Sequence, residues 1–218
     1  TFGYVAGGAQ TVSAQSYYSL ALGGSGAKTF SSTTNIAGDF TVSGSATGIT
    51  TGSTIVFNGT GAQVVAGTTG WTYNNLTING TGPMTLAGAA TVDGTLTLTA
   101  GTFAVGANTL TLNSTVTVTG GVIASGATGT VIFGGAGAQT IPGFNYGNLT
   151  TIGTRTTNSI TLANGGTIGI AGTFSPTATF TTGAYDSTNN TINFNGPGAQ
   201  AIPAFRFYNL TITGDRSG

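Results

Sequence analysis

The tripeptide Gly-Ala-Gln occurs four times in this chain of 218 residues, and each copy introduces a similar stretch of sequence. Aromatic residues follow the glutamine, and a leucine-containing segment follows them. An internal repeat of this kind restricts the fold to architectures in which similar units stack on one another or form an array. The four copies are Gly8-Ala9-Gln10, Gly61-Ala62-Gln63, Gly137-Ala138-Gln139 and Gly198-Ala199-Gln200.

Apolar residues alternate with threonine, serine and asparagine through the repeats, as in Thr95-Leu96-Thr97-Leu98-Thr99. A period of two residues predicts β-strands that bury one face. Helix is disfavoured because the chain has 39 glycines and is rich in threonine, serine and asparagine, which are poor helix formers. Asn-Gly pairs such as Asn58-Gly59 predict turns, since both residues tolerate positive φ.

The copies differ in length in a way that favours a solenoid. The second copy contains an additional segment from about Ala104 to Gly126, which alternates like two strands, and we interpret it as one extra coil. A solenoid accepts whole extra coils because each coil contacts only its neighbours. In the third copy the additional residues are expected in a loop near Thr181 to Ser187, and Thr151-Ile152 interrupts the alternation.

We therefore predict an all-β chain that forms a right-handed parallel β-solenoid (β-helix) of degenerate repeats. An array of β-sandwich domains is the alternative. Residues 1–218 are expected to form a single elongated repeat domain, whose copies span approximately residues 1–53, 54–129, 130–190 and 191–218.

Charge is scarce, with four basic and four acidic residues and a net charge of zero. A neutral chain has no field to attract nucleic acid, so no nucleic-acid partner is expected. The absence of cysteine excludes disulfides and thiolate metal sites, and the absence of histidine also excludes Ser–His and Cys–His nucleophiles. No apolar run is long enough for a membrane span.

Aromatic residues recur at fixed places after each glutamine, and two interpretations compete. They form a ladder of rings inside the coil, stabilised by ring stacking, or they form an exposed platform on which sugars stack. We favour the internal ladder, which consists of Tyr17, Trp71, Tyr73, Phe144, Tyr146, Phe205 and Phe207.

The polar candidates also have structural interpretations. We expect the amide of each Gly-Ala-Gln glutamine to bond to the backbone at a turn or to the glutamine of another coil, instead of contacting a ligand. The carboxylates are scattered: Asp39, Asp93, Asp186 and Asp215. Asp39 and Asp93 are candidates for a hydrolytic pair, and Asp186 with Asn189 and Asn190 for calcium. We nevertheless predict no catalytic residue, cofactor or metal, and treat the sequons at Asn75, Asn148 and Asn209 as repeat consensus.

Three segments carry a resemblance to a known class of proteins: Phe57-Asn58-Gly59-Thr60-Gly61-Ala62-Gln63, Tyr73-Asn74-Asn75-Leu76-Thr77-Ile78 and Thr91-Val92-Asp93-Gly94-Thr95-Leu96-Thr97-Leu98. They resemble the adhesin-like β-solenoid repeats of large secreted bacterial surface proteins, in the style of filamentous haemagglutinin. The resemblance covers nearly the whole chain. It implies an extracellular or cell-surface, non-enzymatic role in adhesion or in a surface fibre, with surface carbohydrate as a candidate partner.

The first functional hypothesis is an extracellular structural protein, either a filament subunit or an adhesin-stalk segment, whose main partner is itself. Both ends of the chain lie inside a repeat, so we expect head-to-tail contacts through strand edges. The expected junction residues are Phe2, Tyr4, Leu210 and Ile212. Two alternatives stay open: an ice-binding protein that uses Thr-x-Thr ladders, and a β-helix protein that binds or cleaves carbohydrate.

Overall fold

The structure of the chain is a computed structural model that describes residues 1–66 and 71–214. Within these ranges there are strands and turns but no helix, and every pair of strands with an assigned register is parallel. The strands form a parallel β-solenoid of about 10 turns, which confirms the predicted fold class. No helix of the described ranges could serve as a membrane span.

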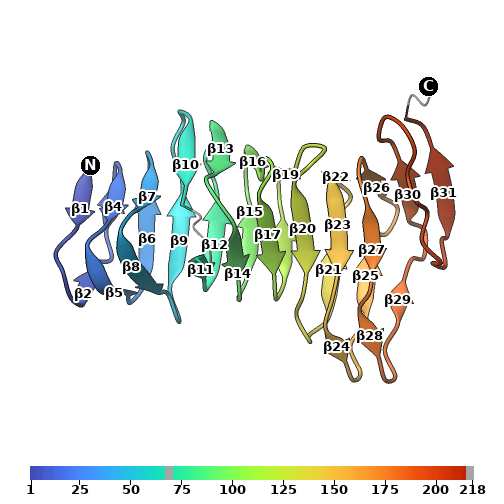
Figure 1. Ribbon diagram of the computed structural model, residues 1–218, viewed down its shortest axis with the longest axis horizontal. Helices are drawn as coiled ribbons and strands as arrows, with labels where there is room; N and C mark the ends of the chain where they lie inside the picture. Colours follow the sequence, from blue (N-terminus) through green and yellow to red (C-terminus); the bar gives the residue numbers. More distant parts are fainter. Residues whose placement is uncertain (67–70, 215–218) are drawn as a thin grey trace. The chain divides into compact units, whose positions relative to one another are not determined.

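The chain is divided into two compact units, and their strands are labelled in Figure 1. The first unit comprises Thr1–Ala104 and Thr117–Val122, and the second comprises Val105–Val116 and Ile123–Gly218. The short strands β18 (Val116–Val118) and β19 (Val122–Ala124) contribute residues to both.

The other strands of the first unit are β1 (Phe2–Tyr4), β2 (Gln10–Val12), β3 (Ser16–Tyr17), β4 (Leu20–Leu22), β5 (Ser25–Phe30), β6 (Thr33–Ile36), β7 (Phe40–Val42), β8 (Ser45–Ile49), β9 (Thr54–Phe57), β10 (Gln63–Val65), β11 (Trp71–Tyr73), β12 (Asn75–Ile78), β13 (Pro83–Leu86), β14 (Ala90–Val92), β15 (Leu96–Leu98) and β16 (Thr102–Ala104). The others of the second unit are β17 (Thr109–Leu112), β20 (Thr130–Phe133), β21 (Gln139–Ile141), β22 (Asn145–Tyr146), β23 (Asn148–Thr151), β24 (Thr154–Arg155), β25 (Ile160–Leu162), β26 (Thr167–Ile170), β27 (Phe174–Pro176), β28 (Thr179–Phe180), β29 (Tyr185–Asp186), β30 (Thr191–Phe194) and β31 (Asn209–Ile212).

In the first unit the strands that pair are three apart along the chain, as in the series β3, β6, β9, β12 and β15. One turn of the solenoid therefore has three sides. The second copy of the repeat holds three more strands (β10 to β20) than the first copy (β2 to β9), which is one additional turn. The predicted extra coil is thus confirmed.

The interior of the first unit is filled by columns of apolar side chains. Ile36, Phe57, Ile78 and Leu98 are in register from strand to strand, and all four are fully buried. Burying one such side chain stabilises the fold by about 1.5–3 kcal/mol. The residues between them, such as Thr77, point outward, because successive side chains of a strand alternate between faces. The period of two in the sequence is this alternation.

Some turns of the second unit have four sides instead of three. Strands β24 and β28 pair with each other there, and β21, β25 and β29 pair in steps of four. The segment from Thr181 to Ser187, where a loop was predicted for the additional residues of the third copy, is therefore only partly a loop. That segment contains β29, whose Tyr185 is in register with Ile160 of β25.

The irregular Thr151 is also part of the interior of the second unit. It is in register with Phe133 and has no exposed surface. Its hydroxyl makes a hydrogen bond of 2.5 Å with the hydroxyl of Tyr185. The inward–outward alternation therefore continues through Thr151. Threonine stands where the pattern predicts an apolar residue, and its buried hydroxyl is satisfied by Tyr185.

Candidate functional site

The glutamine of the second Gly-Ala-Gln copy lies inside the coil and bonds only to backbone groups. Gln63 is 2% exposed. Its Nε2 donates to the carbonyl oxygens of Ile36 (2.9 Å) and Gly38 (2.7 Å), and its Oε1 accepts from the backbone N–H of Gly59 (2.8 Å). Ile36 and Gly38 belong to the preceding turn of the solenoid. One side chain therefore ties two turns together at a point where the ladder of strand hydrogen bonds has ended.

The same amide arrangement recurs in the second unit. Gln139 Nε2 donates to the carbonyls of Leu112 and Ser114, both at 2.9 Å. Gln200 Nε2 donates to the carbonyls of Ile170 and Gly172, and Gln200 Oε1 accepts from the N–H of Gly196. In these three copies one acceptor is the last residue of a strand of the preceding turn, and the other lies two residues after it. The first carbonyl of each pair also accepts a backbone N–H, as Ile36 does from Asn58, so the glutamine adds a second donor there and supplies the donor of the carbonyl two residues later.

In the first and third copies the glutamine oxygen faces a buried cation. Lys28 has no exposed surface, and its Nζ donates to Gln10 Oε1 at 2.8 Å. It also donates to the carbonyls of Ala6, Gly8 and Ser25, at 2.9, 3.1 and 3.2 Å. The ammonium is therefore surrounded by four neutral oxygens.

Arg155 is the buried cation of the third copy and has no exposed surface. It reaches the glutamine from β24, whereas the residue in register with Gln139 is Ile160. Its guanidinium donates to Gln139 Oε1 (2.5 Å), to the carbonyl of Ile152 (2.9 Å) and to the carbonyl of Gly137 (3.3 Å). Burial lowers the pKa of Arg155. Gly8 and Gly137 are the first residues of their motifs, so both cations bind the same two positions of Gly-Ala-Gln.

Burying a charge is costly unless hydrogen bonds replace its hydration. Lys28 and Arg155 meet this condition through dipoles and not through a carboxylate, since no hydrogen bond or ion pair to Asp is found for either among the described residues. Sequence reasoning missed both residues. The sequence did contain a signal for the burial of Lys28. Lys28 lies two residues before Phe30 in β5, so both side chains point to the same, inward face.

Glycines around the motif have two separate roles. Gly8 and Gly198 have φ values of 109° and 86°, a region that residues with a Cβ rarely adopt. At Gly59 the constraint is space, because a methyl group there would collide with the carbonyl oxygen of Ala37. At Gly61, in contrast, a methyl group would meet nothing within 4 Å.

Four of the seven predicted ladder aromatics are buried: Tyr17, Trp71, Tyr73 and Tyr146. In the first unit Trp71 contacts Phe40 and Tyr73 edge to face, with ring centroids 5.4 and 6.2 Å apart. The hydroxyl of Tyr73 donates to the carbonyl of Ala66, and burial raises the pKa of Tyr73. Burial likewise raises the pKa of Tyr146, whose hydroxyl donates to the carbonyl of Pro142. These four rings are not available as a surface platform for sugars.

The other three predicted ladder residues, Phe144, Phe205 and Phe207, are half-buried in the second unit. Phe144 contacts Tyr146 with centroids 6.4 Å apart. Phe205 contacts Phe207 and Tyr185, in both cases with centroids 5.1 Å apart. The structure therefore places them in ring clusters that still reach the surface.

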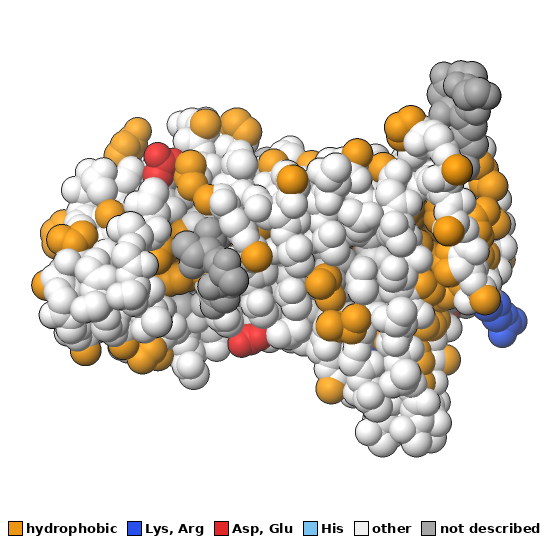
Figure 2. Space-filling view, in the orientation of Figure 1, with side chains coloured by type: hydrophobic (Ala, Val, Ile, Leu, Met, Phe, Trp, Pro, Cys, Tyr) orange, Lys and Arg blue, Asp and Glu red, His pale blue; other side chains and the backbone are white. Residues whose placement is uncertain are grey.

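The carboxylates do not come together as a cluster. Asp39 Oδ1 accepts from the N–H of Val64, and Asp186 Oδ1 accepts from the N–H of Thr188. Asn190, proposed above as a calcium ligand, is turned inward and donates to the carbonyls of Ala163 and Gly166. The described ranges contain no group of three or more potential metal ligands, and Figure 2 shows acidic side chains only at isolated places; Asp215 lies outside those ranges.

Three of the four predicted junction residues are exposed apolar side chains. Phe2, Leu210 and Ile212 are 51%, 40% and 50% exposed. Tyr4 is buried, and its hydroxyl lies 3.0 Å from that of Tyr17.

Two of the sequon asparagines have a clear structural role. Asn75 Oδ1 accepts from the N–H of Thr95, and Asn148 Oδ1 accepts from the N–H of Thr173. Each bond links neighbouring turns at one repeat position. Comparison of the chain with protein-family models, with curated proteins and with solved structures finds no match.

Proposed function

We propose that this chain is a structural segment of an extracellular filament or adhesin stalk, which lengthens by adding further solenoid turns at its strand edges. The observation that carries the proposal is a register at β31. Leu210 and Ile212 are in register with Ile192 and Phe194 of β30. The two residues of β30 are at most 1% exposed, whereas Leu210 and Ile212 are 40% and 50% exposed. The apolar columns of the interior therefore continue into β31, whose side chains are left exposed by the described residues.

Another turn placed on β31 would bury these side chains. It would also pair the backbone N–H and C=O groups on the other edge of β31, which pairs with β30 alone among the described strands. Unpaired parallel edges are templates for strand addition, and the resulting contact combines main-chain hydrogen bonds with apolar burial. The added turn comes from a second copy of this chain in the proposed assembly, which makes the contact head-to-tail.

Distribution of the polar side chains supports a structural role over a catalytic one. The buried Gln63, Gln139, Lys28 and Arg155 all bond to backbone or to one another, so none is directed at a substrate. The Thr-x-Thr segments also favour this role over ice binding. Thr97 is in β15, which pairs with β12, whereas Thr109 and Thr111 are in β17, which pairs with β20. The third segment, in β18, shares a sheet with β15, but β17 belongs to another sheet, so the three segments do not form one continuous flat ladder.

Sedimentation velocity tests the proposal with a matched pair of variants. Wild-type protein should form species that grow with concentration. The double substitution Leu210→Asp and Ile212→Asp should abolish growth, because it places charges on the face to be buried. Ile152→Asp is the control, since Ile152 is as exposed as Leu210, at 40%, but lies outside β31. Equal growth of the double variant and the wild type would refute this edge as the contact.

A further inference from the structure

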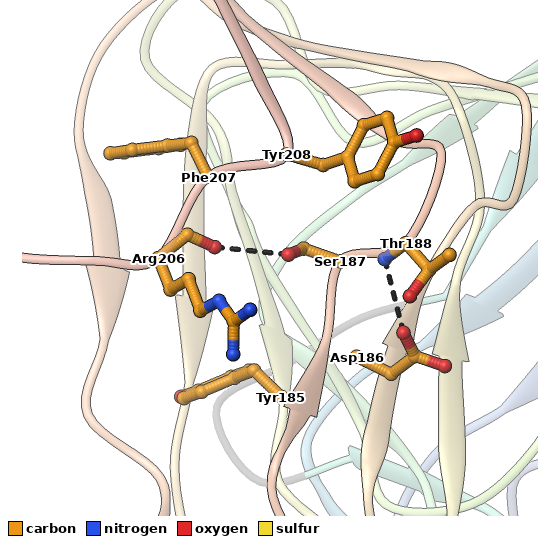
Figure 3. Close-up of a pocket in the computed structure, with 7 residues that line it drawn as sticks. All are labelled: Tyr185, Asp186, Ser187, Thr188, Arg206, Phe207 and Tyr208. Atoms are coloured by element: carbon orange, nitrogen blue, oxygen red, sulfur yellow. Dashed lines mark hydrogen bonds between the residues drawn. The ribbon is translucent and has the colours of Figure 1, made fainter.

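A pocket in the second unit lies between β29 and the segment that leads to β31. Its volume is about 400 Å³, within the range of small-ligand sites. The lining includes Tyr185, Asp186, Thr188, Arg206, Phe207 and Tyr208 (Figure 3). We propose that this pocket binds a short, neutral saccharide. The proposal adds a ligand site to the structural role above and does not depend on assembly.

The walls of the pocket are fixed by contacts behind them. Ser187 Oγ donates to the carbonyl of Arg206 at 3.0 Å and so joins the two segments that form the pocket. The hydroxyl of Tyr185 is held from inside by Thr151 and by the N–H of Ala178. The ring of Tyr185 packs edge to face on Phe180 and Phe205, with centroids 4.9 and 5.1 Å away. A preformed wall lowers the entropy lost on binding.

Several groups in the pocket remain free for a ligand. Tyr208 is 57% exposed, although most large aromatic side chains of the chain are buried. Arg206 is exposed, and no hydrogen bond or ion pair of its guanidinium is found among residues 1–66 and 71–214. Asp186 is exposed as well and uses one carboxylate oxygen for its bond from Thr188. Hydrogen bonds from the Thr188 hydroxyl and backbone lower the pKa of Asp186.

This combination matches the chemistry of a sugar. A pyranose has an apolar face of C–H groups that packs on an aromatic ring, and a rim of hydroxyls that both donate and accept. Tyr208 offers the ring, Asp186 offers an acceptor and Arg206 offers donors. One positive and one negative side chain balance each other, which favours a neutral ligand over an acidic one. In the view of Figure 3, Arg206 extends toward Tyr185 on one side while Asp186 and Tyr208 lie on the other, an arrangement suited to more than one sugar ring.

The test is titration of the full chain with maltotriose, cellotriose and triacetylchitotriose, and with trigalacturonate as the acidic probe. Saturation-transfer NMR and calorimetry report binding, at protein concentrations where sedimentation shows a single species. The binding test therefore remains valid even if the proposed head-to-tail assembly does not occur. We expect at least one neutral trisaccharide to bind with a dissociation constant in the millimolar range or below, and trigalacturonate to bind more weakly or not at all.

Variants assign the binding to this pocket. Tyr208→Ala and Arg206→Ala should each weaken binding about tenfold, and Tyr208→Trp should retain it because a ring is kept. Tyr18→Ala is the matched control, since Tyr18 is 78% exposed in the first unit. No binding of any neutral probe, preference for trigalacturonate, or equal binding by Tyr208→Ala and Tyr18→Ala would each overturn the proposal.

Discussion

Lys28 and Gln10 form a buried pair in which the ammonium Nζ lies 2.8 Å from the amide Oε1. The two residues are in register on neighbouring strands, β5 and β2. In the second repeat copy the same register pairs Gln63 with Met84, and the amide oxygen there bonds to the backbone N–H of Gly59 instead. The glutamine Oε1 is therefore satisfied in two ways at this point of the repeat, by a side-chain cation in the first copy and by a backbone N–H in the second.

The first prediction concerns this pair. Lys28→Met introduces the residue found at the corresponding place in the second copy, but it removes the ammonium donor from Gln10 Oε1 and from the carbonyls of Ala6, Gly8 and Ser25, of which Ser25 keeps the N–H of Gly8. We expect the free energy of unfolding to fall by about 3 kcal/mol. Gln10→Leu should cost less in the Lys28→Met background than in the wild type. A double-mutant cycle from urea unfolding measures the difference, and strictly additive effects would show that the pair is not coupled.

The second prediction concerns the glutamine that joins two turns. Gln63→Leu preserves the approximate size of the side chain and removes two donors and one acceptor from the buried site. We expect a loss of about 3 kcal/mol in the free energy of unfolding, because the freed backbone groups stay buried. The exposed Gln15 is the control, and Gln15→Leu should change stability by less than about 1 kcal/mol. Equal stability of the two variants would show that the Gln63 bonds contribute nothing net.

Two glycines of one turn provide the third prediction. Gly59→Ala places a methyl group against the carbonyl of Ala37, so we expect destabilisation of about 2–3 kcal/mol from the forced shift of the backbone. Gly61→Ala meets open space and should be neutral or slightly stabilising. Thermal unfolding of the two variants side by side measures the contrast. Similar melting temperatures would contradict the close approach of the two turns at Gly59.

The fourth prediction concerns alkaline pH. Burial, together with the hydrogen bond to Tyr4, raises the pKa of Tyr17 to about 12 from the ordinary value of 10.0. A raised pKa means that the folded state holds the proton more tightly than the unfolded state. The contribution of Tyr17 to stability is therefore complete below pH 10 and is lost as pH rises toward 12.

Urea unfolding as a function of pH measures this effect. The free energy of unfolding should fall more steeply in the wild type than in Tyr17→Phe above pH 10, while buried Tyr73 and Tyr146, whose pKa values are also raised, leave a residual slope in both. Tyr18→Phe removes an exposed hydroxyl and should keep the wild-type slope. Parallel curves for wild type and Tyr17→Phe would contradict the assignment.

The fold was predictable because each turn repeats the same local rule. Alternation of apolar and polar residues in segments such as Thr95 to Thr99 gives strands with one buried face, and the repeat makes those strands stack. The additional coil after Ala104 could be recognised by the same alternation. The fourth side of the turns in the second unit could not, because β24 and β28 are two-residue strands with no alternation of their own.

The polar interior was less predictable. A lysine or arginine in a strand usually faces water, and a buried Lys28 is acceptable because Gln10 Oε1 and the carbonyls of Ala6, Gly8 and Ser25 accept its hydrogen bonds. The direction of those carbonyls depends on turn conformation, which the residue pattern does not specify. Thr151 is a similar case, since its partner Tyr185 lies 34 residues away in the sequence. Pocket residues such as Tyr208 and Arg206 had no motif that marked them.

Electron microscopy of the wild-type chain over a range of concentrations tests the central claim most directly. If solenoid turns add at the open edge of β31, where Leu210 and Ile212 are uncovered, negative-stain images should show unbranched fibres of constant width that lengthen with concentration. The double substitution Leu210→Asp and Ile212→Asp should leave isolated particles. Isolated particles of the wild-type protein at every concentration, or fibres of the double variant like those of the wild type, would contradict the account.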